Sequence, residues 1–216
     1  MTRVKICGIT RESDLRTAVA AGADALGFLV DVPVDSPRAI EPARAAELVA
    51  QVPPFVSSVL VTMPGDPARV VDLARTVSPD VVQVHGDLGE GDVAYLRAQL
   101  DAALVKVVSV SDLDAAHRYA DLVDALLVDS ADEDGAGGTG SVHDWERTAR
   151  FVGAVDVPVV LAGGLTAENV ADAVDAVRPF AVDVASGVES CGGEKDEAAV
   201  AAFVRDAKGR RRPVQP

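Results

Sequence analysis

Short apolar runs alternate with stretches of helical periodicity along almost the whole chain. Runs rich in Val, Leu, Ala and Ile and bounded by turn residues indicate buried strands, and the stretches between them repeat their apolar positions with a period of about 3.6 residues. Strands are expected at residues 4–7, 25–29, 55–61, 81–84, 104–108, 125–128, 159–162 and 181–184. The pattern therefore predicts eight strand and helix pairs in one alternating series.

Start and stop signals mark several of the expected helices. Asp66 followed by Pro67 is typical of an N-cap and a first helical residue, and Gly22 is expected to end the first helix. Further N-caps are expected at Ser111, Asp144 and Thr166. An amphipathic last helix over residues 196–208 would cover the seam between the final strand and the first.

This order of elements predicts an α/β fold, a single (β/α)8 TIM barrel, because the chain shows no composition shift and no long linker. We expect the barrel to occupy residues 1–208 and residues 209–216 to form a flexible basic C-terminal tail. The alternative is an open doubly wound sheet. That fold would favour a glycine-rich dinucleotide turn after a strand, and the sequence at 8–10, Gly-Ile-Thr, lacks the GxGxxG spacing.

Composition agrees with buried parallel strands. Hydrophobic residues make up 49% of the 216 positions and aromatic residues only 4%, so the core must be built from aliphatic side chains. No run approaches the roughly 20 apolar residues of a membrane span, and the N-terminus opens directly into a strand. We therefore expect a cytoplasmic protein without a membrane partner. Two cysteines are too few for a disulfide scaffold.

The chain is strongly acidic, with 34 acidic against 20 basic residues and a formal net charge of −14. Such a surface repels nucleic acid and anionic membranes, so a nucleic-acid partner is not expected. Lysine is scarce and most basic residues are Arg, which favours a halophilic protein from a salt-rich cytoplasm. An ordinary acidic protein is the alternative, because net charge bears mainly on solubility and self-repulsion.

Two reactive residue types stand at the ends of predicted strands, where barrel enzymes place their active groups. Cys7 ends the first strand, and Asp129 directly follows the sixth. A carboxyl group at the barrel mouth can be kept protonated by desolvation and act as an acid. The alternatives are that Cys7 is a small buried apolar residue and that Asp129 caps the following loop.

Glycines occur where such barrels often bind phosphate, in the loops after strands seven and eight. Gly163 and Gly164 follow the seventh strand, and Ser186 and Gly187 follow the eighth. Backbone amides can approach an anion closely at glycine. Each pair alone could be an ordinary turn, but the two together predict a phosphate site.

Eight sequence blocks match the pattern of one known family. They are KICGIT at 5–10, GADALGF at 22–28, SPRAI at 36–40, VQVHGD at 82–87, LLVDS at 126–130, GGTG at 137–140, LAGGLTAENV at 161–170 and VDVASGVES at 182–190. The first, third and fourth blocks in this order are highly specific. Over nearly its whole length the chain resembles phosphoribosylanthranilate isomerase, an enzyme family of tryptophan biosynthesis.

The resemblance implies a reaction and two catalytic residues. The reaction is the Amadori rearrangement of the small-molecule substrate N-(5'-phosphoribosyl)anthranilate to 1-(2-carboxyphenylamino)-1-deoxyribulose 5-phosphate. Asp129 would be the general acid that protonates the ribose ring oxygen, and Cys7 the general base that removes the C2' proton. The family needs no metal or organic cofactor. The assembly is expected to be a monomer or a homodimer.

The resemblance also implies a set of substrate-binding residues. Arg38 of the SPR block would pair with the anthranilate carboxylate through its planar fork, although a surface ion pair is the alternative. His85 would line the pocket or order a loop, or be a structural histidine. Asp183 is a charge inside an apolar strand, so it must find a buried partner or help to shape the mouth. Ser186 and the amide of Gly187 would contact phosphate, with Gly163 and Gly164 beside them.

Two other functions remain open at this level. One is a related phosphate-binding barrel with different chemistry, such as the synthase or the sugar isomerase of a neighbouring step in amino-acid biosynthesis. The synthase would call for a lysine at the mouth, but Lys106 in the fifth strand has no partner set of that kind. A non-catalytic protein that binds a phosphorylated metabolite would keep the phosphate site alone. The three histidines are scattered, so no metal site is expected.

Overall fold

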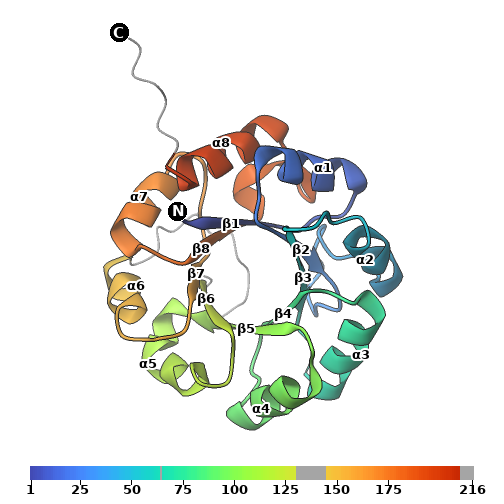
Figure 1. Cartoon of the computed structure of the whole chain (residues 1–216), viewed down its shortest axis with the longest axis vertical. Helices are drawn as coiled ribbons and strands as arrows, with labels where there is room; N and C mark the ends of the chain where they lie inside the picture. The colour runs from blue at the N-terminus through green and yellow to red at the C-terminus, as the bar shows by residue number, and fades with distance from the viewer. Residues whose placement is uncertain (64, 130–144, 210–216) are drawn as a thin grey trace.

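Eight parallel strands close into a barrel in the computed structural model, which describes residues 1–63, 65–129 and 145–209 (Figure 1). The strands are β1 (Arg3–Cys7), β2 (Ala25–Leu29), β3 (Ser57–Thr62), β4 (Val81–Val84), β5 (Ala103–Ser109), β6 (Ala125–Asp129), β7 (Val159–Leu161) and β8 (Ala181–Val184). Each strand pairs with the next, and β8 pairs with β1. The predicted (β/α)8 barrel is therefore confirmed, and the open sheet is excluded.

Helices form a ring around the barrel, as Figure 1 shows in a view along it. They are α1 (Glu12–Ala21), α2 (Pro42–Val49), α3 (Pro67–Val77), α4 (Glu90–Gln99), α5 (Leu113–Ala116), α6 (Trp145–Val152), α7 (Val170–Val177) and α8 (Glu197–Ala207). The last helix, α8, packs against α1 and β1, so it covers the seam as expected. No helix within the described ranges is both long and apolar enough to cross a membrane.

Helix boundaries follow the sequence signals in part. The Asp66 carboxylate accepts the N–H of Ala68 at the start of α3, and Gly22 ends α1 in the left-handed conformation, as predicted. The N-cap expected at Ser111 is wrong. Instead, the Ser109 hydroxyl accepts the Ser111 N–H, so the capping residue lies two positions earlier, at the end of β5.

The two other expected caps have different outcomes. The Thr166 hydroxyl accepts the N–H of Glu168 in a turn that leads into α7, but the helix itself begins only at Val170. Its first residues are therefore preceded by a turn rather than directly by the threonine. Asp144 lies outside the described residues.

The predicted start of the third strand at residue 55 is also wrong, because β3 begins at Ser57. Phe55 has a φ of +72° and a fully exposed side chain, which a strand position would not allow. The apolar pattern extended the strand into a turn that follows Pro53 and Pro54.

Alternation along the strands divides the side chains between two environments. Outward residues such as Val4, Ile6 and Val182 pack beneath the helices in the main core. Inward residues form a smaller cluster around Cys7 and Val59. The barrel interior also holds buried polar groups, which are Lys5, Gln83 and Asp183. Polar side chains that could take part in chemistry therefore lie inside the barrel.

A short antiparallel pair of strands follows β8 and was not predicted. Its strands are β9 (Glu189–Cys191) and β10 (Glu194–Lys195), and they come after a 3-10 turn at Ser186–Val188. The pair packs against α1, so it extends the segment after β8 along the rim toward the segment after β1.

Candidate active site

Cys7 and Asp129 are the last residues of β1 and β6. All strands of the barrel run in the same direction, so both residues lie at the same rim. Val4 and Ile6 point outward into the main core, as do Leu126 and Val128, and strand alternation therefore directs Cys7 and Asp129 to the inner side. The rim carries a thiol and a carboxyl group that face a common opening.

Gly27 leaves room for the Cys7 side chain. The two residues are direct partners in the β1–β2 register, and a Cβ on Gly27 would come within 2.7 Å of the Cys7 sulfur. The same Cβ would lie 3.1 Å from Cε of Lys5. Because both side chains occupy the space above Gly27, Lys5 and Cys7 are neighbours inside the barrel.

The electrostatic surroundings of Cys7 act in opposite directions. Burial raises the pKa of the thiol above its ordinary value, and the negative charge of Asp183 adds to this rise. Lys5 and Lys195 lower the pKa, but less than burial raises it. The Cys7 thiolate is thus stabilised by two nearby ammonium groups, and Lys5 lowers the pKa of Cys7 more than Lys195 does.

Lys5 and Asp183 form a buried ion pair across β1 and β8, with 2.9 Å between Nζ and Oδ2. Burial disfavours the ammonium, but the charges of Asp183 and Cys7 outweigh it and raise the pKa of Lys5. The expected buried partner of Asp183 is therefore confirmed. Its second oxygen, Oδ1, is buried without a hydrogen-bond partner among the described residues, which leaves an acceptor inside the barrel.

His85 directly follows β4 and lies in the same polar group. Its Nε2 is 3.0 Å from the Gln83 side-chain nitrogen, and with that amide as donor the ring carries its proton on Nδ1. Burial lowers the pKa of His85 to about 4, and the positive charges of Lys5 and Lys106 act in the same direction. The imidazole is therefore neutral near pH 7 and offers an N–H donor.

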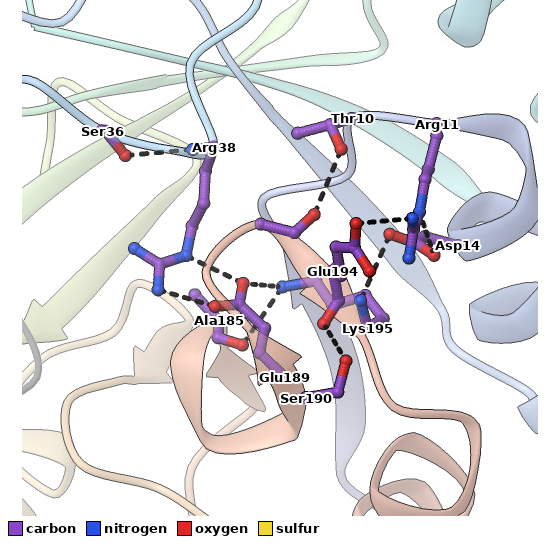
Figure 2. A network of polar contacts seen from close by, with 11 residues as sticks. Thr10, Arg11, Asp14, Ser36, Arg38, Ala185, Glu189, Ser190, Glu194 and Lys195 are labelled. Atoms are coloured by element: carbon purple, nitrogen blue, oxygen red, sulfur yellow. Dashed lines mark hydrogen bonds and ion pairs between the residues drawn. The ribbon is translucent and has the colours of Figure 1, made fainter.

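Arg38 lies beside the rim. Its aliphatic part crosses Gly8, the residue after Cys7, where a Cβ would come within 2.7 Å of Arg38 Cδ. Its guanidinium donates two hydrogen bonds of 2.8 Å to Glu189, whose side chain is 4% exposed (Figure 2). Arg38 is thus ion-paired, as the alternative interpretation held, but its partner is buried rather than on an open surface.

The loop after β7 has the backbone form that glycine permits. Gly163 and Gly164 have φ of +87° and +62°. The Asn169 side chain donates to the Gly164 carbonyl at 2.9 Å and accepts the Thr166 N–H at 2.8 Å. These hydrogen bonds order the turn, so the loop conformation is prepared before any ligand binds.

The loop after β8 touches the loop after β7. Gly187 lies against the carbonyl of Leu165, and a Cβ on Gly187 would come within 2.0 Å of that oxygen. Ser186, at the start of this turn, is exposed. The structure therefore brings the two predicted phosphate-binding loops together at the rim that carries Cys7.

In the described part of the chain, no group of three His, Cys, Asp or Glu side chains could hold a metal ion. Both cysteines are free thiols, Cys7 buried and Cys191 exposed. The described residues of this rim supply a thiol, carboxyl groups and cationic side chains.

Comparison with known proteins places these observations in a family. The model of the family described as N-(5'phosphoribosyl)anthranilate (PRA) isomerase matches residues 4–206. The chain belongs to this family. A relative named N-(5'-phosphoribosyl)anthranilate isomerase from Halobacterium salinarum is 61% identical over 210 residues, covering 96% of each chain. The relative of the same name from Haloferax volcanii is 54% identical, covering 99% of this chain and 96% of its own.

Solved structures of family members have the same fold. Phosphoribosyl anthranilate isomerase from Thermotoga maritima superposes with a TM-score of 0.87 at 37% identity, covering 97% of this chain and 100% of its own. Another phosphoribosyl anthranilate isomerase, 36% identical with a TM-score of 0.84 and the same coverage, was solved with reduced 1-(o-carboxyphenylamino)-1-deoxyribulose 5-phosphate. The resemblance inferred from the sequence blocks is confirmed, and the haloarchaeal relatives fit the halophilic interpretation.

Four residues of the rim were not found from the sequence as functional candidates. Lys5 and Gly27 lie in matching blocks, and Lys5 stands two positions before Cys7, a spacing that puts both on one face of a strand. This spacing could have identified Lys5 as a neighbour of Cys7. Glu189 also lies in a matching block, at 182–190, but its partner Arg38 is 151 positions away, so the sequence does not show the pairing. Lys195 lies outside the matching blocks.

Proposed function

We propose that this protein catalyses the Amadori rearrangement of N-(5'-phosphoribosyl)anthranilate in tryptophan biosynthesis. The product is 1-(2-carboxyphenylamino)-1-deoxyribulose 5-phosphate, so the enzyme is an aldose-ketose isomerase. The observation that carries the proposal is the family match over residues 4–206, on a barrel whose β1 and β6 end in a thiol and a carboxyl group at one rim.

Asp129 acts first, as the general acid. It donates a proton to the ribose ring oxygen, the bond from C1' to that oxygen breaks, and the anthranilate nitrogen supplies the electron pair that forms the iminium ion. This opens the ring and makes the C2' proton acidic. Support comes from the position of Asp129 at the end of β6, on the inner side of the rim.

Cys7 acts second, as the general base. Its thiolate removes the C2' proton, the electrons of that bond form a double bond between C1' and C2', and the iminium nitrogen becomes neutral. The resulting enolamine tautomerises to the ketone. Since burial raises the pKa of Cys7, the ammonium of Lys5 is needed to stabilise the thiolate during this step.

The other side chains bind and orient the substrate. The Gly163 and Gly164 turn and the Ser186 and Gly187 turn hold the phosphate, which fits the contact between their loops. Arg38 pairs with the anthranilate carboxylate. The remaining binding groups are Asp183 Oδ1, which accepts a hydrogen bond from a substrate hydroxyl, and the neutral His85, which donates a hydrogen bond to another.

The proposal is tested by following the loss of phosphoribosylanthranilate fluorescence in high salt with the wild type, Cys7→Ser and Asp129→Asn. We expect each substitution to lower kcat by a factor of about 100 or more, the usual contribution of a positioned acid or base. Binding of a product analogue should persist in both variants. A wild type that binds the analogue without any turnover would instead indicate a non-catalytic binding protein.

We further infer a cofactor-free cytoplasmic enzyme whose catalytic barrel spans residues 1–208. The tail expected at 209–216 lies, after residue 209, outside the described residues. The net charge of −14 supports the absence of a nucleic-acid partner. Removal of residues 209–216 should leave kcat and KM unchanged in the same assay.

Of the two expected assembly states we favour the homodimer, formed at the rim opposite the active site. Phe55 precedes β3 at that rim, fully exposed and with a φ of +72°, beside a cavity of about 710 Å³ that it helps to line. The lining beside Phe55 is largely apolar and includes Val49, Val52, Pro53 and Pro54, and a contiguous exposed apolar surface marks an interface. The related Thermotoga maritima enzyme is described as dimeric. Light scattering tests this. We expect a dimeric mass for the wild type and a monomeric mass for Phe55→Ser, whereas a monomeric mass for both proteins would contradict the dimer.

A further inference from the structure

Glu189 and Lys195 of the β9–β10 pair carry buried charges that the proposed reaction does not use. Their side chains are 4% and 0% exposed. Burying charged groups costs free energy unless they are well paired, and an apolar pair is often at least as stable. This cost calls for a functional explanation, and the contacts of Glu189 supply one.

Glu189 is held between two cations, as Figure 2 shows. Its carboxylate accepts hydrogen bonds from Nε and Nη2 of Arg38, both at 2.8 Å, and from Nζ of Lys195 at 2.7 Å. Lys195 also donates to the Ala185 carbonyl at 3.1 Å, which anchors the group to the end of β8. Burial opposes the charge, but the hydrogen bonds from Arg38 and Lys195 outweigh it and hold the pKa of Glu189 below its ordinary value.

The pairing uses only one edge of the Arg38 guanidinium. Nε and one proton of Nη2 point to Glu189, and Nη1 has no acceptor among the described residues. A guanidinium has five N–H donors, so its end edge, formed by Nη1 and Nη2, can bind a second carboxylate in a bidentate manner. The Arg38 side chain is 22% exposed, so part of it is open to a ligand.

The position of Arg38 is fixed by close packing as well as by charge. The hairpin formed by β9 and β10 meets the loop before Arg38 at Gly193, where a Cβ would come within 2.5 Å of the Pro37 carbonyl. The aliphatic part of Arg38 lies over Gly8, next to Cys7. The hydrogen bond to Glu189 and the nearby Cys7 charge both raise the pKa of Arg38. Arg38 is therefore held near Cys7.

We propose that Glu189 is a positioning residue that, fixed by Lys195, holds one edge of Arg38 so that the other edge receives the carboxylate of the substrate. This inference rests on the proposed function and extends it to a residue that contacts no reacting atom. Without Glu189, Arg38 keeps its charge but must lose rotamer freedom when the substrate binds, which weakens binding. The acid and base steps are unaffected, so the loss falls on KM rather than on kcat.

The test compares two substrates, N-(5'-phosphoribosyl)anthranilate and N-(5'-phosphoribosyl)aniline, which lacks the carboxylate. For Glu189→Gln we expect KM for the first substrate to rise about tenfold, as for one charge-assisted hydrogen bond, with kcat changed less than about threefold. KM for the aniline substrate should change less than about twofold. In an Arg38→Ala background, Glu189→Gln should add nothing further.

Glu194→Gln is the matched control. Glu194 lies in the same hairpin and pairs with Arg11 at 3.0 Å, so its substitution should leave both KM values unchanged. If Glu189→Gln does not fold, as judged by circular dichroism, Lys195→Met replaces it in the test. In that variant KM for the anthranilate substrate should rise about threefold, less than for Glu189→Gln, because Arg38 keeps its bonds to Glu189.

Equal losses on both substrates, or an unchanged KM for the anthranilate substrate, would overturn the role of Glu189. Failure of the proposed function has a different signature, which is a wild type inactive on both substrates.

Discussion

Gly27 faces Cys7 across the β1–β2 register, and a single methyl group at Gly27 would overlap the Cys7 sulfur, at 2.7 Å. A cysteine sulfur cannot share that space with another carbon, so one of the two side chains must move. The position of the proposed base is thereby determined by the absence of a side chain on the neighbouring strand.

Gly27→Ala should therefore impair catalysis more than folding. The added methyl group displaces the Cys7 thiol, and we expect kcat to fall at least about tenfold, while overpacking lowers the free energy of unfolding by about 1–3 kcal/mol. Steady-state kinetics and urea denaturation in high salt measure the two effects. Wild-type kcat in this variant would show that the thiol position is not critical.

The buried pair of Lys5 and Asp183 makes a prediction about stability. Lys5→Met leaves the Asp183 carboxylate buried without its partner, which should cost about 3–5 kcal/mol of unfolding free energy. In the double variant Lys5→Met, Asp183→Asn, most of this loss should be recovered, because neither charge of this buried pair remains. Denaturant titration of the three proteins tests this, and a single variant as stable as the wild type would contradict it.

The same variants separate stability from the ionisation of Cys7. Lys5 lowers the pKa of Cys7 more than Asp183 raises it, so the double variant should have a higher Cys7 pKa than the wild type although it is stably folded. The pH dependence of iodoacetamide alkylation, read for Cys7 in a Cys191→Ser background, measures this. Its midpoint should move to higher pH, and kcat/KM should fall at neutral pH. A midpoint that moves to lower pH would refute the role given to Lys5.

His85 makes the fold sensitive to acid. Its pKa is about 4 in the folded protein against an ordinary 6.5, so the unfolded chain binds the extra proton between these values. The associated stability is present above pH 6.5 and is lost as the pH falls toward 4, by about 2–3 kcal/mol. His85→Asn should lose correspondingly less stability between pH 7 and pH 4.5, measured by chemical denaturation.

His117→Asn is the control for that comparison, because His117 is exposed. Equal acid sensitivity of His85→Asn and the wild type would show that the His85 imidazole is not buried in its neutral form.

Much of this protein was already determined by its sequence. Apolar runs of strand length with helices between them lead to a barrel, because parallel strands joined by helices can bury all these runs only in a closed or covered sheet. Strand direction then places Cys7 and Asp129 at one rim. The same reasoning places the glycine pairs after β7 and β8, because loops that follow parallel strands all lie at one end of the barrel.

Other features were decided only by tertiary structure. The bonds from Arg38 to Glu189 and from Lys5 to Asp183 join residues 151 and 178 positions apart. Local periodicity carries no information about such pairs. They form because closure of the barrel brings β8 beside β1 and the hairpin after β8 against the segments after β1 and β2. The sequence could thus indicate which groups stand at the opening, whereas the closed barrel decides which of them hold one another in place.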